Sequence, residues 1–141
     1  MDHVVYVDSK SKELEKLLSG SKTMIIRGAI GRKLPYGKVN INDILYFIRN
    51  NGEGTIQAKA EVIKVKNSDK MDKDESVELV EQNQIKLQLN DIQFSKWAGK
   101  RYLVLLEIAH VSKIDPQSID RSAYGNMDDW LPVNDVKTVL K

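Results

Sequence analysis

Apolar residues recur at two spacings along the chain, every second position in some stretches and every third or fourth in others. Residues 3–7 form a short β-favouring run. Three leucines at helical spacing follow Ser9, which suits a helix N-cap, and Gly20 stands where glycine commonly ends a helix. We therefore expect a strand, a short helix that ends at Gly20, and a second strand over residues 22–27.

The middle of the chain carries an antiparallel pattern. Residues 43–48 form an apolar run, and residues 49–54 have the turn sequence RNNGEG. The returning run is apolar at every second position from Ile56 to Val62 and then shifts by one, to Ile63 and Val65. Such a shift predicts a β-bulge, so this region is predicted to be a hairpin with a bent return strand.

The second half of the chain has longer elements. A polar connection at residues 67–73 leads into a helix that begins at Asp74, and a second short helix follows Asn90 and stops before Gly99. Residues 101–111 are almost entirely apolar, which favours a central strand. The last segment is turn-rich, and we expect it to dock through its apolar and aromatic residues and to end in a brief helix. Those residues are Tyr124, Trp130, Leu131 and Val133.

This order of elements favours an α+β fold over a wound parallel sheet, because the hairpin and the bulge are antiparallel features. We expect a small mixed, partly closed β-barrel with short flanking helices. Residues 1–141 then form a single domain, with residues 113–141 as a C-terminal extension packed on the barrel.

Composition narrows the possible chemistry. With 41% apolar and 30% charged residues the chain resembles an ordinary globular domain. It has no cysteine, which excludes disulfides, thiol nucleophiles and thiolate zinc sites, and its two histidines make a metal site improbable. We expect no cofactor, because no Walker, dinucleotide-binding or serine-hydrolase motif is present. No apolar run is long enough for a membrane span, so we expect a cytoplasmic protein without a membrane partner; the oligomeric state stays open.

Charge is unevenly distributed, although the net charge is only +2. Residues 22–38 contain five Lys and Arg residues and no acid, whereas residues 69–81 hold six acids against two lysines. The first segment should attract anions and the second should be a solvated acidic surface.

The most specific motif combines Gly20, Lys22 and Arg27. It resembles the Gly-x-Lys-x-x-Glu-x-Arg signature of ASCH domains in the PUA-like superfamily, with Ile25 in place of the glutamate. The chain also looks like small archaeal proteins of this superfamily. The resemblance implies a PUA-like barrel and an association with RNA recognition.

Our first hypothesis is a module that binds RNA or a modified nucleobase through this basic segment. Lys22 offers a cation to a phosphate or carbonyl, and Arg27 can grip a phosphate or stack on a base. The loop at residues 28–38 adds positive charges and a ring for base stacking. Its residues are Arg32, Lys33, Tyr36 and Lys38. The competing interpretations are a solvated lysine, a strand-end arginine paired with a carboxylate, and a loop that is merely soluble surface.

A second hypothesis is a small amidohydrolase acting on an acylated nucleoside. The Lys22 segment resembles that of small bacterial ASCH proteins that deacetylate N-acetylcytidine, in which a lysine acts with a threonine and a downstream glutamate. Lys22 can be carried over, but the threonine position is Ile25, which cannot be a nucleophile. Glu107 is the candidate carboxylate, and the hypothesis requires it to share a cavity with Lys22.

A third hypothesis is a protein-interaction domain using the acidic helix at residues 74–83 or the aromatic C-terminus. Two further features have structural interpretations. His110 lies in an apolar run, which favours a hydrogen-bonded core histidine. Asp128, Asp129 and Trp130 are interpreted as a cap on the C-terminal helical region or on the barrel rim.

Overall fold

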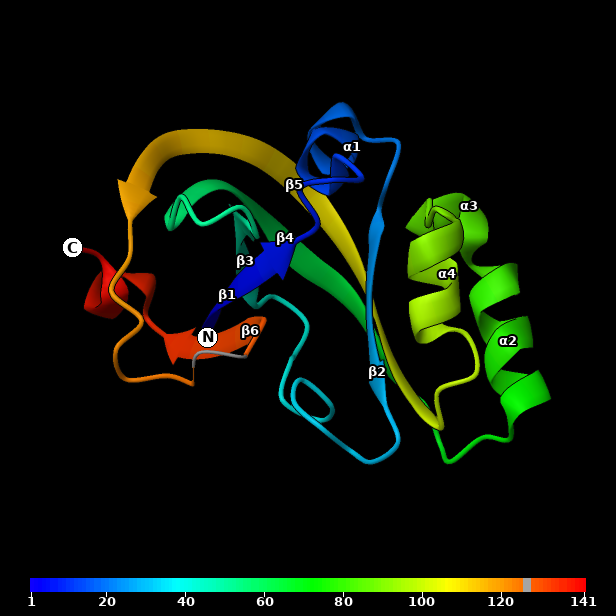
Figure 1. Cartoon of the computed structure of the whole chain (residues 1–141). Helices are drawn as coiled ribbons and strands as arrows, with labels where there is room; N and C mark the ends of the chain where they lie inside the picture. The colour runs from blue at the N-terminus through cyan, green and yellow to red at the C-terminus, as the bar shows by residue number, and fades with distance from the viewer. Residues whose placement is uncertain (126–127) are drawn as a thin grey trace.

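The computed structural model describes residues 1–125 and 128–141. Its centre is a six-stranded sheet with the strand order β2-β5-β4-β3-β1-β6, curled into a half-barrel (Figure 1). The strands are β1 (Asp2–Val7), β2 (Met24–Ala29), β3 (Ile44–Arg49), β4 (Thr55–Asn67), β5 (Tyr102–Ser118) and β6 (Trp130–Asn134). β1 runs parallel to β3 and every other neighbouring pair is antiparallel. The predicted α+β fold with a mixed, curled sheet is therefore confirmed.

The two longest strands, β4 and β5, bend the sheet. Their pairing shifts register at three places, and each shift adds a local kink. One shift lies between Val62 and Lys64, where the apolar positions of the sequence change face, so the predicted bulge is confirmed. β5 continues past the predicted end at residue 111 to Ser118.

The helices are α1 (Glu13–Ser19), α2 (Lys73–Gln82), α3 (Gln84–Leu87) and α4 (Asp91–Trp97), with a 3₁₀ turn η1 (Val136–Val139) near the C-terminus. Asp72 with Glu75, and Asn90 with Gln93, form capping boxes at α2 and α4. Gly20 ends α1 with φ 81°, as predicted. The predicted cap at Ser9 is wrong: the N-cap is Lys12, in the left-handed conformation and without a side-chain hydrogen bond.

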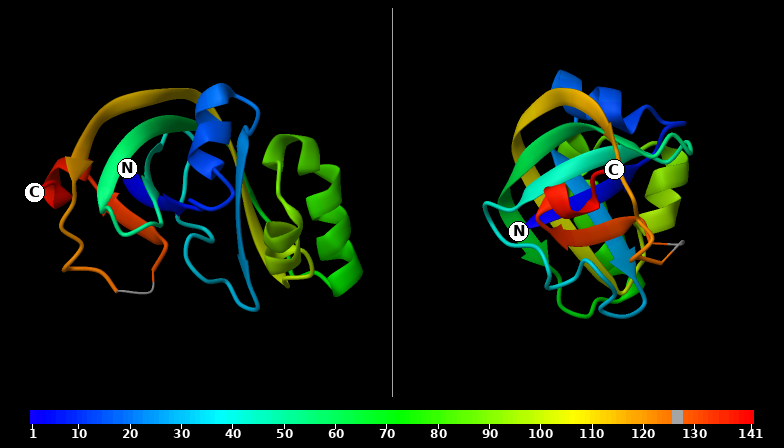
Figure 2. Two further views of the ribbon diagram at one scale, coloured as in Figure 1. Left: turned by 45° about the horizontal axis from the view of Figure 1, so that its top comes forward. Right: turned by 90° about the vertical axis from the view of Figure 1, so that its left-hand side faces the viewer.

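Three apolar clusters hold the layers together. The inner cluster fills the half-barrel around Phe47, Ile25 and Leu106. A second cluster, including Leu103 and Leu105 of β5, packs α2, α3 and α4 on the outer face of β2 and β5 (Figure 2). The third lies beneath β6 and η1. Because residues alternate along β2, Met24 and Ile26 face the helices while Ile25 and Arg27 face the inside of the half-barrel.

The C-terminal segment is more regular than the sequence predicts. Trp130, Leu131 and Val133 are buried, and their segment is strand β6, which pairs with β1 at the edge of the sheet. Tyr124 packs against the cluster beneath β6. Within residues 1–125 and 128–141, no helix has the length and apolar character needed to cross a membrane.

Candidate nucleobase-binding cleft

A cleft of about 450 Å³ lies between the end of β1, helix α4 and the chain that leads into β6. Its lining mixes charged and aromatic side chains. The cations are Arg27, Lys96 and Arg121, and the acids are Asp8, Glu13, Asp128 and Asp129. Tyr6 and Trp97 contribute half-buried rings. The opposite charges nearly balance, so the cleft is polar without a strong net charge.

Arg27 joins the two edges of the curled sheet. It stands on the edge strand β2, and its Nη2 donates a hydrogen bond to the Tyr6 carbonyl of β1 at 2.6 Å. Its Nε lies 3.2 Å from an oxygen of Asp129, just before the other edge strand β6. The geometry is not that of a hydrogen bond, so this Nε has no hydrogen-bond partner among the described residues. Arg27 is only 7% exposed and lies beside a carboxylate, as the competing interpretation holds, but it stands within β2 rather than at its end.

Two tryptophan rings flank the Arg27 guanidinium. Its central carbon lies 5.8 Å from the ring centre of Trp97 and 5.6 Å from that of Trp130. Lys96 approaches the ring centre of Trp97 to 4.8 Å, and Arg121 lies over Tyr6. Such a cation–ring contact contributes about 0.5 to 1 kcal/mol where the cation is exposed, as at Lys96, and about 2 kcal/mol where it is desolvated, as at Arg27. The cleft thus presents rings and cations in alternation.

A buried chain of hydrogen bonds holds Trp130 in place behind Arg27. The indole N–H of Trp130 donates to Nδ1 of His3 at 3.1 Å, and Nε2 of His3 lies 2.9 Å from Asp43. Because an indole nitrogen can only donate, Nδ1 must accept and the imidazole proton must be on Nε2. Burial alone raises the pKa of Asp43, but the hydrogen bonds from the Asn40 N–H and from His3 outweigh it and hold that pKa below its ordinary value.

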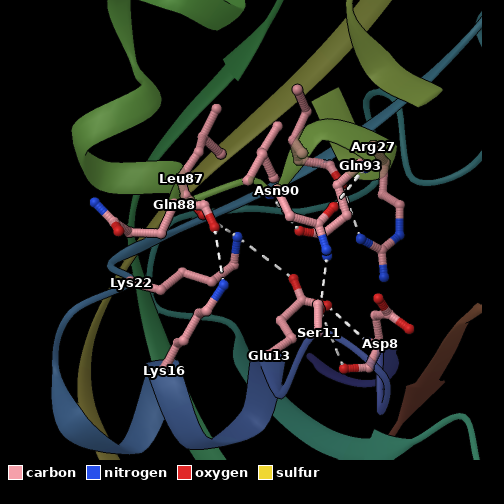
Figure 3. Close-up of polar contacts among 12 residues, drawn as sticks. Asp8, Ser11, Glu13, Lys16, Lys22, Arg27, Leu87, Gln88, Asn90 and Gln93 are labelled. Atoms are coloured by element: carbon pink, nitrogen blue, oxygen red, sulfur yellow. Dashed lines mark hydrogen bonds and ion pairs between the residues drawn. The ribbon is translucent and has the colours of Figure 1, made fainter. Parts of the chain in front are cut away.

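Lys22 lies beneath α1, where it pairs with Glu13 (Figure 3). Its ammonium is 3.4 Å from Oε2 of Glu13 and donates to the Leu87 carbonyl at 2.5 Å. Glu13 also accepts a hydrogen bond from the backbone N–H of Asp8 at 2.8 Å. Burial lowers the pKa of Lys22, against the opposing effect of the Glu13 carboxylate. Lys22 is 1% exposed, so the expected mobile cation is instead a buried, paired one.

Glu107 does not meet Lys22. Its carboxylate lies 3.1 Å from Lys86, and both line a small depression of about 80 Å³ beside β4. The carboxylate next to Lys22 is that of Glu13, nine residues earlier in the chain. The shared cavity that the hydrolase hypothesis requires for Lys22 and Glu107 is therefore absent among the described residues.

The loop at residues 28–38 lies away from the cleft lining, at the far end of β2 (Figure 1). The Tyr36 hydroxyl donates to the Ser68 carbonyl, and its ring packs edge-on against Tyr102 at 5.6 Å between centres. Arg32 lies over both rings. The ring of Tyr36 is thus engaged in packing rather than free to stack on a base, while Lys33 and Lys38 are exposed.

Other sequence expectations need correction. His110 is exposed, with φ 56° beside a register shift of β5, because the bulge turns it out of the core. Of the two interpretations of Asp128, Asp129 and Trp130, the helix cap is wrong: Asp129 faces Arg27, Asp128 lines the cleft and Trp130 begins the edge strand β6. Gly20 does not line the cleft; it borders a shallow depression with Lys22. Within the described ranges, no three His, Asp or Glu side chains are grouped so that they could hold a metal ion.

Comparison with solved structures identifies the architecture. The ASCH protein from Zymomonas mobilis superposes with a TM-score of 0.67 at 13% identity, over 92% of this chain and 85% of the other. A mutant of that protein gives 0.70 at 14% identity, over 97% and 91%. The N-terminal domain of Staphylothermus marinus McrB gives 0.56 at 10% identity, over 94% and 87%. The chain has an ASCH-type, PUA-like fold. No family model and no curated protein matches the sequence.

In this ASCH-type fold several cleft residues come from segments that the sequence motif does not include. Glu13 and Asp8 lie before the motif, Trp97 ends α4, and Asp129 precedes β6. The one signal available in the sequence was the spacing of Lys22 and Arg27. Arg27 lines the cleft, and Lys22 pairs with the cleft residue Glu13. Nothing local to the other residues indicates that they meet there.

Proposed function

We propose that this protein is an RNA-binding module that holds one unpaired or modified base in the cleft. The observation that carries the proposal is Arg27, more than nine-tenths buried between Trp97 and Trp130 at the cleft. Trp97 is half-buried and offers ring surface for stacking, and the buried Arg27 guanidinium, 5.8 Å from its ring centre, positions that ring.

The size and charge of the cleft also support a base as its occupant. A volume of about 450 Å³ is within the range of small-molecule sites, about 300 to 1,000 Å³. Its three cations are matched by four carboxylates, so a phosphate gains little by entering it. An uncharged planar group suits this lining better.

The fold is consistent with this proposal without determining it. ASCH and PUA-like domains are associated with RNA recognition, but one fold can support several functions. The argument therefore depends on the cleft side chains themselves.

A fluorescence titration tests the proposal. Trp97 and Trp130 are the two tryptophans of the chain, and both flank Arg27, so intrinsic fluorescence reports on the cleft. Mixed-sequence single-stranded RNA and single nucleosides should quench it. Trp97→Leu should weaken binding about 5- to 150-fold, the value of one stacking contact of about 1 to 3 kcal/mol.

Tyr36→Phe is the matched control, because it alters a ring outside the cleft and removes only the hydrogen bond to Ser68. It should leave nucleoside binding unchanged. Equal affinity of the wild type and Trp97→Leu for both RNA and nucleosides contradicts the proposal.

Hydrolysis of an acylated nucleoside is the second candidate, favoured by the Lys22–Glu13 pair. Glu13 lines the cleft and Lys22 has a lowered pKa, the combination that suits proton transfer. Water adds to the acyl carbon, the C–N bond breaks, and a proton moves through Glu13 to the departing amine. Release of acetate from N-acetylcytidine by the wild-type protein, monitored by NMR, tests it; no release ends this candidate.

A further inference from the structure

One end of the molecule gathers positive charge from three separate segments. They are residues 28–38, 66–73 and 99–101, the chain that connects the ends of β2, β4, α4 and β5 (Figures 1 and 2). We call this surface the basic end. Its cations are Arg32, Lys33, Lys38, Lys66, Lys70, Lys73, Lys100 and Arg101.

Hydrogen bonds fix these segments to one another. The Tyr36 hydroxyl donates to the Ser68 carbonyl at 2.5 Å, and the Gly37 N–H donates to Asn67 at 2.9 Å. The Met71 N–H donates to the Arg101 carbonyl at 3.0 Å. A side chain at Gly28 would collide with Leu103 and crowd Lys100, so the segments also approach closely there. These contacts hold the three segments of the basic end in a fixed arrangement, so they do not behave as independent loops.

The cations of the basic end make no ion pairs, although acids lie at its margin. All eight are without an ion pair among the described residues, and seven of them are exposed, Lys100 being half-buried. The same segments contain Asp69 and Asp72, and Asp72 caps α2. Glu75 and Glu78 of α2 line a depression together with Lys66 and Lys70. Because the whole chain has a net charge of only +2, the remainder carries more acids than bases. Exposed, unpaired cations are thus concentrated at this end, with the acids of α2 at its margin.

The basic end adjoins the proposed base site along the chain. Arg27 of the cleft immediately precedes Gly28, and Trp97 stands three residues before Lys100. A strand with one base against Trp97 reaches these segments by extending past the cleft lining, first toward Lys100. The charge-balanced cleft does not attract phosphates, whereas the basic end does.

We propose that the basic end binds the sugar–phosphate backbone of the single-stranded RNA whose base occupies the cleft. This inference depends on the proposed function for the identity of the strand. Contacts of this kind are independent of sequence, and each neutralised phosphate adds about 0.7 to the slope of log affinity against log salt for a single strand.

Two quadruple variants, which change the net charge by the same amount, test the role of the basic end. The first is Lys33→Gln, Lys38→Gln, Lys70→Gln and Arg101→Gln at the basic end. The control is Lys59→Gln, Lys113→Gln, Lys137→Gln and Lys141→Gln, exposed lysines elsewhere. Single-stranded RNA is titrated with each across a salt series. The basic-end variant should lose about 3 from the magnitude of the slope, and the control should lose less than about 1. Equal slopes in the two variants overturn the proposal.

Nucleoside binding, measured in parallel, separates this proposal from the previous one. Both quadruple variants should bind nucleosides with the affinity of the wild type, because the cleft is unchanged. A slope lost only in the basic-end variant, with no nucleoside binding in any protein, supports the basic end and contradicts the cleft. Poly-glutamate provides the last comparison: if it binds the wild type as tightly as RNA does, the assignment to a nucleic-acid backbone is overturned.

Discussion

The buried cations in and beside the cleft differ in their surroundings from the exposed cations of the basic end. Lys22 and Arg27 are buried, and each lies beside a carboxylate, Glu13 or Asp129. Lys33 and Arg101 are exposed and have no ion pair among the described residues. A buried charge must be compensated nearby, so its field is cancelled within a few ångströms. An exposed, unpaired charge adds little to stability, but its field extends over about 10 Å at moderate salt.

This difference assigns different measurements to the two regions. Substitutions at the cleft should change the free energy of unfolding and the selectivity for a base. Substitutions at the basic end should change the salt dependence of binding and leave stability almost unaltered.

The largest expected effect comes from breaking the buried Lys22–Glu13 pair. Lys22→Met leaves the Glu13 carboxylate and the Leu87 carbonyl without the ammonium, and should lower the free energy of unfolding by about 3 to 5 kcal/mol. Adding Glu13→Leu should recover much of that loss, because no uncompensated charge then remains. Urea denaturation measures both. A double variant less stable than Lys22→Met contradicts the pairing.

The same pair predicts a dependence of stability on pH. The pKa of Lys22 in the folded state is lower than its ordinary value of 10.5. At pH values between the folded-state pKa and 10.5, the unfolded chain therefore binds more protons than the folded one. Stability from this group therefore rises as the pH rises across that window. Urea denaturation at a series of alkaline pH values should show the rise in the wild type and its absence in the Lys22→Met, Glu13→Leu protein.

Arg27 comes next in expected size. Arg27→Met removes the donor to the Tyr6 carbonyl and both cation–ring contacts, which should cost about 2 kcal/mol of stability. Arg27→Lys keeps the charge but loses the planar donor set. It should therefore be more stable than Arg27→Met but bind nucleosides as weakly as Arg27→Met does. Nucleoside affinity equal to that of the wild type in Arg27→Lys contradicts the role given to the guanidinium.

His3 allows a finer test of the same region. His3→Asn keeps an acceptor near the position of Nδ1 and so preserves the bond from the Trp130 indole, whereas His3→Gln keeps a donor toward Asp43 and loses that bond. We expect His3→Gln to lower the free energy of unfolding by about 1 kcal/mol, because the buried Trp130 N–H loses its acceptor. The same change should shift the Trp130 indole resonance in NMR spectra. His3→Asn should leave that resonance nearly in place. Identical spectra of the two variants contradict the hydrogen-bond chain.

The smallest expected effect on stability belongs to the basic end. Lys33→Gln should change the free energy of unfolding by less than about 0.5 kcal/mol, because the side chain is exposed and unpaired. It should still remove about 0.7 from the magnitude of the salt slope for single-stranded RNA. A stability loss above 1 kcal/mol would show that Lys33 has a structural partner.

Local sequence rules predicted the local parts of this fold. The hairpin between β3 and β4, the bulge after Val62 and the glycine end of α1 each depend on neighbouring residues. The parallel pairing of β1 with β3, and the addition of β6 beside β1, depend on segments far apart in the chain. No local pattern encodes such pairings.

The candidate site shows the same distinction between local features, which the sequence predicts, and contacts between distant segments, which it does not. The spacing of Lys22 and Arg27 drew attention to two residues that are both buried beside carboxylates, and Arg27 lines the cleft. It could not reveal that Glu13 meets Lys22, or that Trp97 and Trp130 enclose Arg27, because those contacts join separate elements. Tyr36 shows the converse: its sequence context resembles an exposed ring, but a hydrogen bond to Ser68 and contact with Tyr102 draw it into the packing.

The most direct test of the base site follows the two tryptophan indole N–H resonances in NMR spectra while a short single-stranded RNA is added. Trp97 is half-buried in the cleft lining and Trp130 lies behind Arg27, bonded to His3. The cleft account predicts a large, saturable shift of the Trp97 resonance and a smaller one for Trp130, both reproduced by a single nucleoside. Saturable RNA binding that leaves both indole resonances unmoved would contradict it.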